Sequence, residues 1–257
     1  DLPYLSNQEL SPAIRYATEE FIPLPITEVN LNWQVLMRAQ DKKSRTVVFV
    51  VASPKTIIQK YIKVINMAGL HPKALETETI AATRSLAEAN PFSPTTLIIQ
   101  MGGTTTDFAV TSKGLILLTR SISTGGAALT RAIAQSFNFE ALQAEEYKKV
   151  YGLLSDQLEG KVFATLKPTM DVILEEVKRV IQAYLTKNPQ NPIKRAVLSG
   201  GGAKLPGLVI YMASGLGLEV QEADPWYFVA KDNRVKVRLA QDAPAYSVAV
   251  GLALREG

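Results

Sequence analysis

Alternating and helically spaced apolar positions divide the front of the chain into strand and helix segments. Apolar side chains alternate with Asn30 and Asn32, which predicts a half-buried strand over residues 29–37. The continuous apolar stretch over 46–52 predicts a second strand that has both faces covered or is central in its sheet. The polar residues 40–44 lie between these segments and predict a turn.

The residues before the first strand predict a helix with two alternative starts. Ser6 and Glu9 have the spacing of a capping box, in which each side chain bonds a free backbone amide. Pro12 leaves two interpretations open: the helix is kinked there, or it begins later with Ser11 as its cap. The apolar positions that predict its buried face are Leu10, Ile14, Ala17 and Phe21.

A second helix is predicted after the second strand. Ser53 is its expected cap, Pro54 lies in its first turn, and Gly69 ends it. Its inner face is expected to carry Ile58, Ile62 and Ile65. After this helix we expect a short strand over 73–76, a helix over 79–88 and a turn over 90–94 that marks a domain boundary.

The remainder of the chain alternates between strands, glycine-rich turns and helices, which predicts an α/β fold. The expected strands are 97–101, 107–111, 115–121, 195–199 and 218–221. One helix is expected to begin at Gly125–Gly126, and the other expected helical segments are 140–187, 205–215 and 245–255. A break is expected over 188–192.

Composition narrows the class of protein further. Of the 257 residues, 47% are hydrophobic and 20% are charged, which excludes a disordered chain, a collagen and a coiled coil. The net charge of +4 comes from interleaved acids and bases, so no nucleic-acid-binding stripe is expected. With no cysteine and one histidine, His71, thiolate and histidine-rich metal sites are excluded. Uninterrupted apolar runs reach six residues, far below the roughly 20 of a membrane span.

Two glycine-rich turns that follow buried strands are candidates for anion binding. Glycine allows a backbone to approach a phosphate closely, and successive amides with threonine hydroxyls can donate to it. Neither turn matches the Walker P-loop or the G-x-G-x-x-G fingerprint, and ordinary turns are the alternative interpretation of each. The first comprises Gly102, Gly103, Thr104, Thr105 and Thr106, and the second comprises Gly200, Gly201, Gly202 and Lys204.

One charged pair on a predicted helix is a further candidate. Glu145 and Lys148 are three residues apart, so both can reach the same side of a helix. A carboxylate can accept from ribose hydroxyls, and a lysine stem can lie along a purine. The alternative interpretation is an ordinary solvated helix face.

The order of these motifs resembles a known family. The strand, the Gly-Gly-Thr-Thr-Thr turn, the hairpin, Gly125–Gly126, the A-E-x-x-K helix and the later G-G-G-A-x-L-P-G segment are similar to the second half of the actin-like ATPases, such as FtsA. The front segment, with Leu-Pro-Tyr-Leu-Ser at residues 2–6 and Phe-Ile-Pro-Leu-Pro at 21–25, resembles the PilM family of type IV pilus assembly. The tail over 245–255 is similar as well.

The resemblance implies a two-lobed actin-like (ribonuclease H-like) α/β fold, incomplete at its amino-terminal side. It implies an FtsA-like 1C subdomain over residues 1–77 and a helix over 78–91 that returns to the first lobe. The other implied parts are a second lobe over 92–139 and 195–242, a helical insertion over 140–194, and a terminal helix over 243–257 that packs on the first lobe.

The resemblance also implies a ligand and partners. ATP or ADP, with Mg²⁺, would bind at the two glycine turns, at Gly125 and Gly126, and at Glu145 and Lys148. The implied partner is the short cytoplasmic amino-terminal peptide of a PilN-like inner-membrane protein. The chain would then be cytoplasmic and reach the membrane only through partners; contact with the pilus motor ATPase and homo-oligomers are left open.

Two departures from the family pattern predict weak or absent ATP hydrolysis. The first phosphate loop, of the Asp-x-Gly type, is expected upstream of Asp1. The second loop normally follows an acidic residue that helps to place Mg²⁺, and this position is Gln100, whose uncharged amide is a poor ligand for a hard cation. ATP is therefore expected as a structural or regulatory ligand. An FtsA-like division protein and a sugar kinase of the same superfamily are the alternatives.

Overall fold

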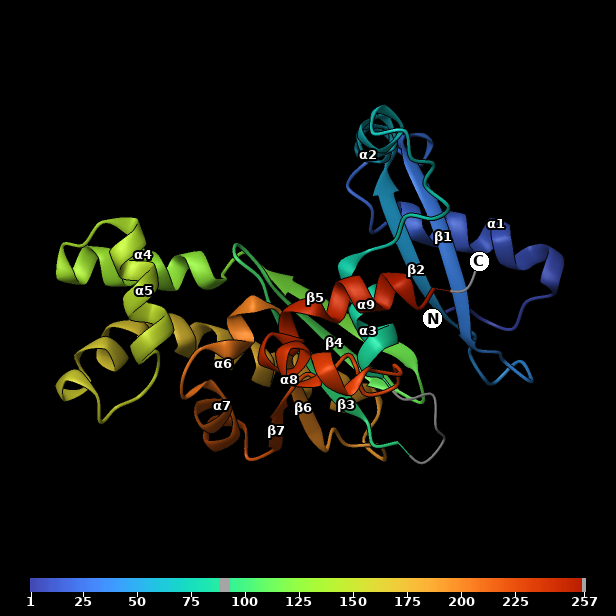
Figure 1. Cartoon of the computed structure of the whole chain (residues 1–257). Helices are drawn as coiled ribbons and strands as arrows, with labels where there is room; N and C mark the ends of the chain where they lie inside the picture. The colour runs from blue at the N-terminus through green and yellow to red at the C-terminus, as the bar shows by residue number, and fades with distance from the viewer. Residues whose placement is uncertain (88–92, 256–257) are drawn as a thin grey trace. The chain divides into compact units, whose positions relative to one another are not determined.

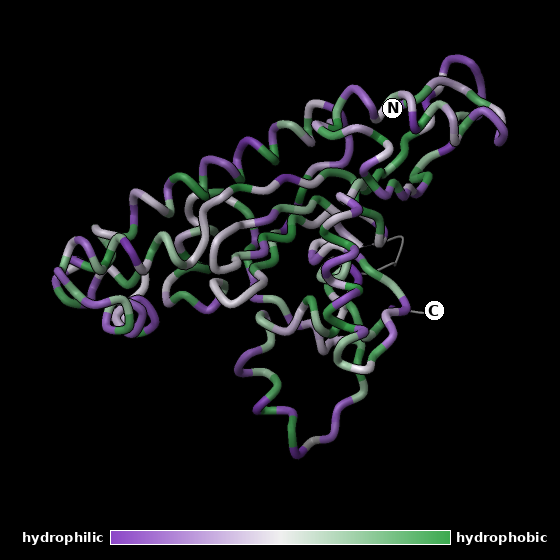
Figure 2. Tube along the Cα trace, turned by 90° about the horizontal axis from the view of Figure 1, so that it is seen from above, coloured by the Kyte–Doolittle hydropathy of each residue, from purple (hydrophilic) through white to green (hydrophobic). Residues whose placement is uncertain are grey.

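The computed structural model describes residues 1–87 and 93–255. The chain forms two compact units, which we describe separately: unit 1 comprises Asp1–Glu76 and unit 2 begins at Thr77. The end of the helix predicted over 79–88 and most of the turn predicted over 90–94 lie outside the described residues. Hydrophobic and hydrophilic stretches are interspersed along the whole trace (Figure 2).

Unit 1 is a two-stranded antiparallel sheet with two helices (Figure 1). Strand β1 (Val29–Met37) pairs with β2 (Val47–Pro54), with Val29 opposite Pro54 and an irregularity between Val35 and Met37. The short 3₁₀ helix η1 (Ile26–Glu28) precedes β1. The two α-helices are α1 (Asn7–Glu19) and α2 (Lys55–Met67).

The capping box predicted at the start of α1 is confirmed. The Ser6 amide donates to Glu9 Oε2 at 2.8 Å, and Pro12 lies inside the helix, so the later start at Ser11 is wrong. Leu10 and Ile14 are buried as predicted. Phe21 is not on the buried face, because the helix ends at Glu19 and leaves this ring 79% exposed.

Three other expectations for unit 1 are wrong. The residues of β2 are half-buried or exposed because, within the described ranges, β2 pairs with the strand β1 alone, so its apolar run does not indicate a central strand with both faces covered. Ser53 does not cap α2, because Ser53 and Pro54 still pair with β1. Residues 73–76 form no strand. The isoleucine face of α2, over Ile58, Ile62 and Ile65, is half-buried as predicted.

Unit 2 is built on a five-stranded mixed sheet with the order β5-β4-β3-β6-β7 (Figure 1). Strands β3 and β4 are antiparallel, and β3 and β6 are parallel. The strands are β3 (Thr96–Met101), β4 (Thr106–Ser112), β5 (Leu115–Ile122), β6 (Arg195–Ser199) and β7 (Glu219–Glu222).

Helices cover both faces of this sheet, which leaves β3 fully buried. Leu97, Ile99 and Met101 point into the main core with α6 (Lys161–Lys187). On the opposite face, α3 (Glu78–Leu86) packs against α9 (Ser247–Ala253). The other helices are α4 (Gly126–Phe137), α5 (Ala141–Tyr151), α7 (Leu208–Leu216) and α8 (Asn233–Gln241).

Two predicted helices of unit 2 differ at their starts. The segment predicted to begin at Leu205 begins at Leu208, because the glycine turn first forms a 3₁₀ helix, η3 (Gly201–Lys204). The last helix is preceded by a separate 3₁₀ helix, η4 (Ala243–Tyr246). Helix α8 was not predicted, since its valines and basic residues alternate in the manner of a strand.

Candidate functional site

The first glycine turn is fixed by the amino-terminal end of α4. The amides of Gly126 and Ala127 donate to the carbonyls of Gly102 and Gly103 at 2.9 and 2.8 Å. A side chain at Gly125 would lie 2.6 Å from the Gly102 carbonyl oxygen, so only glycine permits this approach. The free amides at the start of α4 therefore bind the turn itself. Gly103 and Thr104 remain exposed at its tip.

The second glycine turn lies beside the first. Gly200 has a φ of +80°, and its amide donates to the Pro244 carbonyl at 2.9 Å. A Cβ on Gly202 would lie 2.7 Å from the Met101 side chain at the end of β3. Because Met101 directly precedes the first turn, the parallel pairing of β3 and β6 brings the two turns together.

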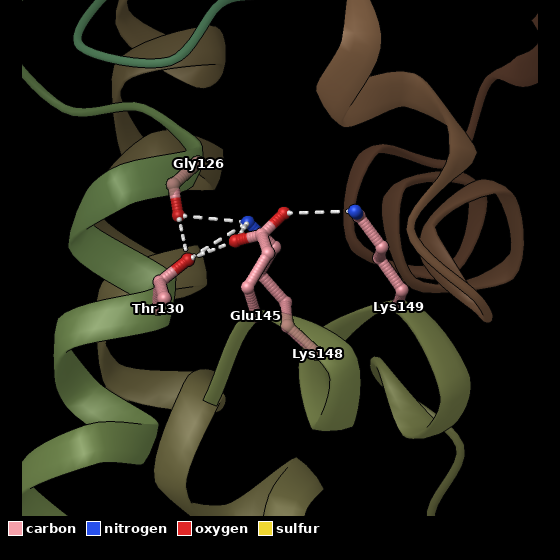
Figure 3. Close-up of polar contacts among 5 residues, drawn as sticks. All are labelled: Gly126, Thr130, Glu145, Lys148 and Lys149. Carbon is pink, nitrogen blue, oxygen red and sulfur yellow. Dashed lines mark hydrogen bonds and ion pairs between the residues drawn. The ribbon is translucent and has the colours of Figure 1, made fainter. Parts of the chain in front are cut away.

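A polar network that we call the α4–α5 clasp joins two helices next to these turns. Lys148 Nζ donates to Glu145 Oε2 at 2.6 Å, to Thr130 Oγ1 at 2.9 Å and to the Gly126 carbonyl at 3.2 Å. Thr130 Oγ1 also lies 2.6 Å from Glu145 Oε2. Figure 3 shows the lysine between the carboxylate of its own helix and the first turn of α4. The clasp thereby fixes α5 relative to α4, whose first amides hold the first glycine turn.

The clasp shifts the ionisation of Glu145. Burial alone would raise the pKa of this carboxyl, but the hydrogen bonds from Lys148 and Thr130 and the charges of Lys148 and Lys149 outweigh burial. The pKa of Glu145 therefore lies below its ordinary value of 4.5. The carboxylate is ionised at neutral pH.

This shift predicts how the contribution of Glu145 to stability depends on pH. Because the folded state lowers the pKa, the stabilisation is fully present above pH 4.5 and is lost as the pH falls further. We expect the difference in unfolding free energy between the chain and its Glu145→Gln variant to be constant from neutral pH to about pH 5 and to shrink below that. Chemical denaturation over this range measures it; a difference that persists unchanged to about pH 3 would contradict the clasp.

The two glycine turns and the clasp line one pocket of about 980 Å³ within unit 2. Its walls come from the start of α4, the exposed side of α5, η3 and η4. Of the residues predicted as a nucleotide site, those that line it are Gly102, Gly103, Gly126, Glu145, Lys148, Gly201, Gly202 and Lys204.

Other residues predicted for this site support the walls of the pocket. Thr106 is buried, and its hydroxyl donates to the Thr124 carbonyl at 2.7 Å. The Thr105 hydroxyl donates to Asp107 at 3.4 Å. Gly125 and Gly200 hold the turns, as described above, and Thr104 lies at the exposed tip of the first turn.

Several residues of the pocket were not predicted from the sequence. Thr130 lies one helical turn after Gly126, so its place beside the glycine turn could have been found once α4 was predicted. The others come from separate segments and carry no local motif. Missed residues with polar side chains are Thr130, Arg131, Lys149 and Asp242, and the missed apolar lining includes Ala127, Leu129, Ala141, Leu142 and Leu205.

Gln100, the amide at the position expected to be acidic, points toward α3. It is 6% exposed, and its Nε2 donates to Glu78 Oε2 at 3.3 Å. Its Oε1 is buried and has no hydrogen-bond partner among the described residues. This amide oxygen is therefore shielded from the pocket.

The chemistry of the pocket suits an anionic ligand with an apolar part. Backbone amides at exposed glycines, lysines from two elements and a carboxylate lie around an opening partly lined by Ala127 and Leu142. Within the described residues, no group of three or more histidine, cysteine or acidic side chains is placed to hold a metal ion. These walls can bind a phosphorylated ligand, but they do not form a cage for a cation.

Comparisons with solved structures define the class of this protein. The chain matches MreB5 of Spiroplasma citri bound to ADP with a TM-score of 0.60, at 19% identity over 79% of this chain and 65% of that chain. It matches the ethanolamine utilization protein EutJ of Carboxydothermus hydrogenoformans with a TM-score of 0.55, at 26% identity over 75% of this chain and 59% of that chain. The protein has the actin-like fold, as predicted.

The family follows from a match along almost the whole chain. Residues 3–257 match the family model of the type IV pilus assembly protein PilM. The chain is also similar to a chain of a PilM–PilN type IV pilus biogenesis complex, with a TM-score of 0.83 and 28% identity over 99% of this chain and 74% of that chain. The chain belongs to the PilM family, which confirms the predicted resemblance.

Division proteins are also among the relatives of this chain. FtsA of Neisseria meningitidis serogroup B is 26% identical over 231 residues, which cover 80% of this chain and 53% of that protein. FtsA of Bacillus subtilis is 23% identical over 79% of this chain and 48% of its own length. The chain thus spans about half the length of these relatives. No helix in the described ranges is both long and apolar enough to cross a membrane.

Proposed function

We propose that this protein is an actin-like adaptor of type IV pilus assembly that binds a purine nucleotide and the amino-terminal peptide of a PilN-like protein. The nucleotide is a structural or regulatory ligand, and the peptide binds through unit 1. The observation that carries the nucleotide part is the convergence of both glycine turns and the α4–α5 clasp on one pocket. Membership of the PilM family carries the pilus part.

The chemistry of the pocket supports the proposal that it binds a nucleotide. The exposed tip at Gly103 can bring backbone amides to phosphate oxygens, since a side chain there would meet nothing within 4 Å. Glu145 is ionised and lines the pocket, and its Oε1, which accepts no hydrogen bond from Lys148 or Thr130, can accept from a ribose hydroxyl. The apolar side chains of Ala141 and Leu142 on α5, with Leu205 directly after η3, can cover the base.

An apolar flank on α2 supports the peptide-binding part. Ile57, Tyr61 and Val64 lie on successive turns of the helix and are 48%, 62% and 67% exposed. They lie beside the isoleucine face that packs on the sheet. Three large apolar side chains exposed in one row are typical of surfaces that receive an apolar segment. The PilM–PilN complex found among similar structures supports a PilN-like peptide as this segment.

Substitution on this flank is expected to weaken peptide binding. A Tyr61→Ser variant removes an exposed aromatic anchor and should raise the Kd for a synthetic PilN-like amino-terminal peptide by about tenfold, with little effect on folding. Fluorescence anisotropy measures the Kd. Lys63→Ala, on the opposite side of α2, is the matched control and should bind as the unaltered chain does. Equal binding by both variants would contradict the placement of the peptide on this flank.

The remaining parts of the proposal concern the cellular setting. A PilN-like partner anchored in the inner membrane would hold the adaptor at its cytoplasmic face. Contact with the pilus motor ATPase, or self-association, would then couple this platform to pilus extension. Co-sedimentation with vesicles that carry the partner, compared with bare vesicles, tests the indirect attachment.

A further inference from the structure

The pocket carries more positive than negative charge. Four of its lining residues are cationic and two are acidic, which leaves a net formal charge of +2: the cations are Arg131, Lys148, Lys149 and Lys204, and the acids are Glu145 and Asp242.

Both acids of the pocket already face ammonium groups. Glu145 Oε2 lies 2.6 Å from Lys148 Nζ, and its other oxygen lies 3.8 Å from Lys149 Nζ. Asp242 Oδ1 lies 2.7 Å from Lys204 Nζ. A divalent cation at either carboxylate would have to displace a lysine. The acids of this pocket therefore neutralise the charge of lysines and are not free to bind a metal ion.

The strand end that leads into the first glycine turn offers no substitute ligand. The Gln100 amide oxygen is buried, so it cannot reach an ion in the pocket. The amide nitrogen donates to Glu78, which ties the side chain to the face of the sheet covered by α3. Beside substrate phosphates and waters, Mg²⁺ is usually held by one or two protein carboxylates, and both carboxylates of this pocket face lysines. The residues of this pocket do not fit a bound Mg²⁺.

We propose that the pocket takes its nucleotide as the free polyanion, without Mg²⁺, and that lysine and arginine side chains neutralise the phosphates. This inference rests on the nucleotide function proposed above. Mg²⁺ removes part of the charge of ATP and so weakens its attraction to a cationic pocket. Hydrolysis by this site is not expected, because Mg²⁺ normally neutralises the charge that develops on the transferred phosphoryl group.

The test compares ATP binding with and without the metal. Isothermal titration of the chain with ATP is carried out in excess EDTA and in excess MgCl₂. We expect binding in EDTA to be equal to, or about two- to fivefold tighter than, binding in MgCl₂. Binding that is at least about tenfold tighter in MgCl₂ overturns this inference and leaves the nucleotide function standing. No binding in either buffer overturns both.

A variant on the exposed edge of the pocket tests the role of the lysines separately. Lys149 is 63% exposed, so Lys149→Ala should leave the fold intact. It should weaken ATP binding in EDTA by about two- to fivefold, and by less in MgCl₂. Lys178→Ala, which removes a similarly exposed lysine of α6 outside the pocket lining, is the control. Unchanged affinity of Lys149→Ala in EDTA would contradict charge neutralisation by this side chain.

Discussion

Replacing Gly251 by alanine is expected to destabilise unit 2 by about 3 kcal/mol or more. Gly251 lies where α9 crosses α3, and a Cβ at this position would overlap the carbonyl oxygen of Ala81. The overlapped atom belongs to helix backbone, so it cannot rotate away as a side chain would. The helix propensity of alanine, worth about 1 kcal/mol over glycine, is too small to offset the overlap.

The crossing is also held by hydrogen bonds that an added methyl group would disturb. Arg84 Nη1 donates to the Gly251 carbonyl at 2.7 Å, and the Ser85 hydroxyl donates to the Ser247 carbonyl at 2.8 Å. These bonds form only when the two helices approach closely. Separating the helices would therefore cost hydrogen bonds as well as packing.

Thermal unfolding measures this effect. For a unit of this size, we expect the Tm of Gly251→Ala to fall by about 10 °C. Gly103→Ala is the matched control, since a Cβ at Gly103 meets nothing within 4 Å. If Gly251→Ala had the same Tm as the unaltered chain, α3 and α9 would not cross at this glycine.

Removal of the Lys148 ammonium is expected to have the largest effect on ligand binding. Lys148→Met keeps the length of the side chain but leaves Glu145, Thr130 and the Gly126 carbonyl without their shared donor. The Lys148 side chain is only 13% exposed and that of Glu145 is 34% exposed, so water can replace only part of these bonds. We expect a loss of about 1–3 kcal/mol in stability and an increase of at least about tenfold in the Kd for ATP.

A neighbouring lysine provides the control for this prediction. Lys149 lies 3.8 Å from the same carboxylate and is largely exposed, so Lys149→Met should change stability by less than about 0.5 kcal/mol. Denaturant unfolding and ATP titration of both variants distinguish the effect of losing the hydrogen bonds of the clasp from the effect of losing one positive charge. Equal effects of the two substitutions would contradict the central position of Lys148 in the clasp.

Sequence patterns predicted most of the elements because each pattern reflects a local constraint. The capping box at Ser6 and Glu9 is a contact between neighbours in the sequence, and it predicted the start of α1 despite Pro12. The strand leading to Gly102 is buried on both faces, and the apolar residues Leu97, Ile98 and Ile99 on both of its faces predicted this. Local patterns failed for β2, whose apolar run lies in a sheet of two strands, and for α8, whose alternation is typical of strands.

The glycine turns, the Glu145–Lys148 spacing and the family resemblance were thus accessible from the sequence by itself, since each depends on residues close together in the chain. The tertiary structure decided what they do together. The parallel pairing of β3 and β6 places two turns about 100 residues apart side by side. The packing of α5 on α4 directs Lys148 to Thr130 and Gly126, and the packing of α3 on the sheet holds the Gln100 side chain away from the pocket. These contacts depend on how separate elements pack, and no spacing within one segment encodes them.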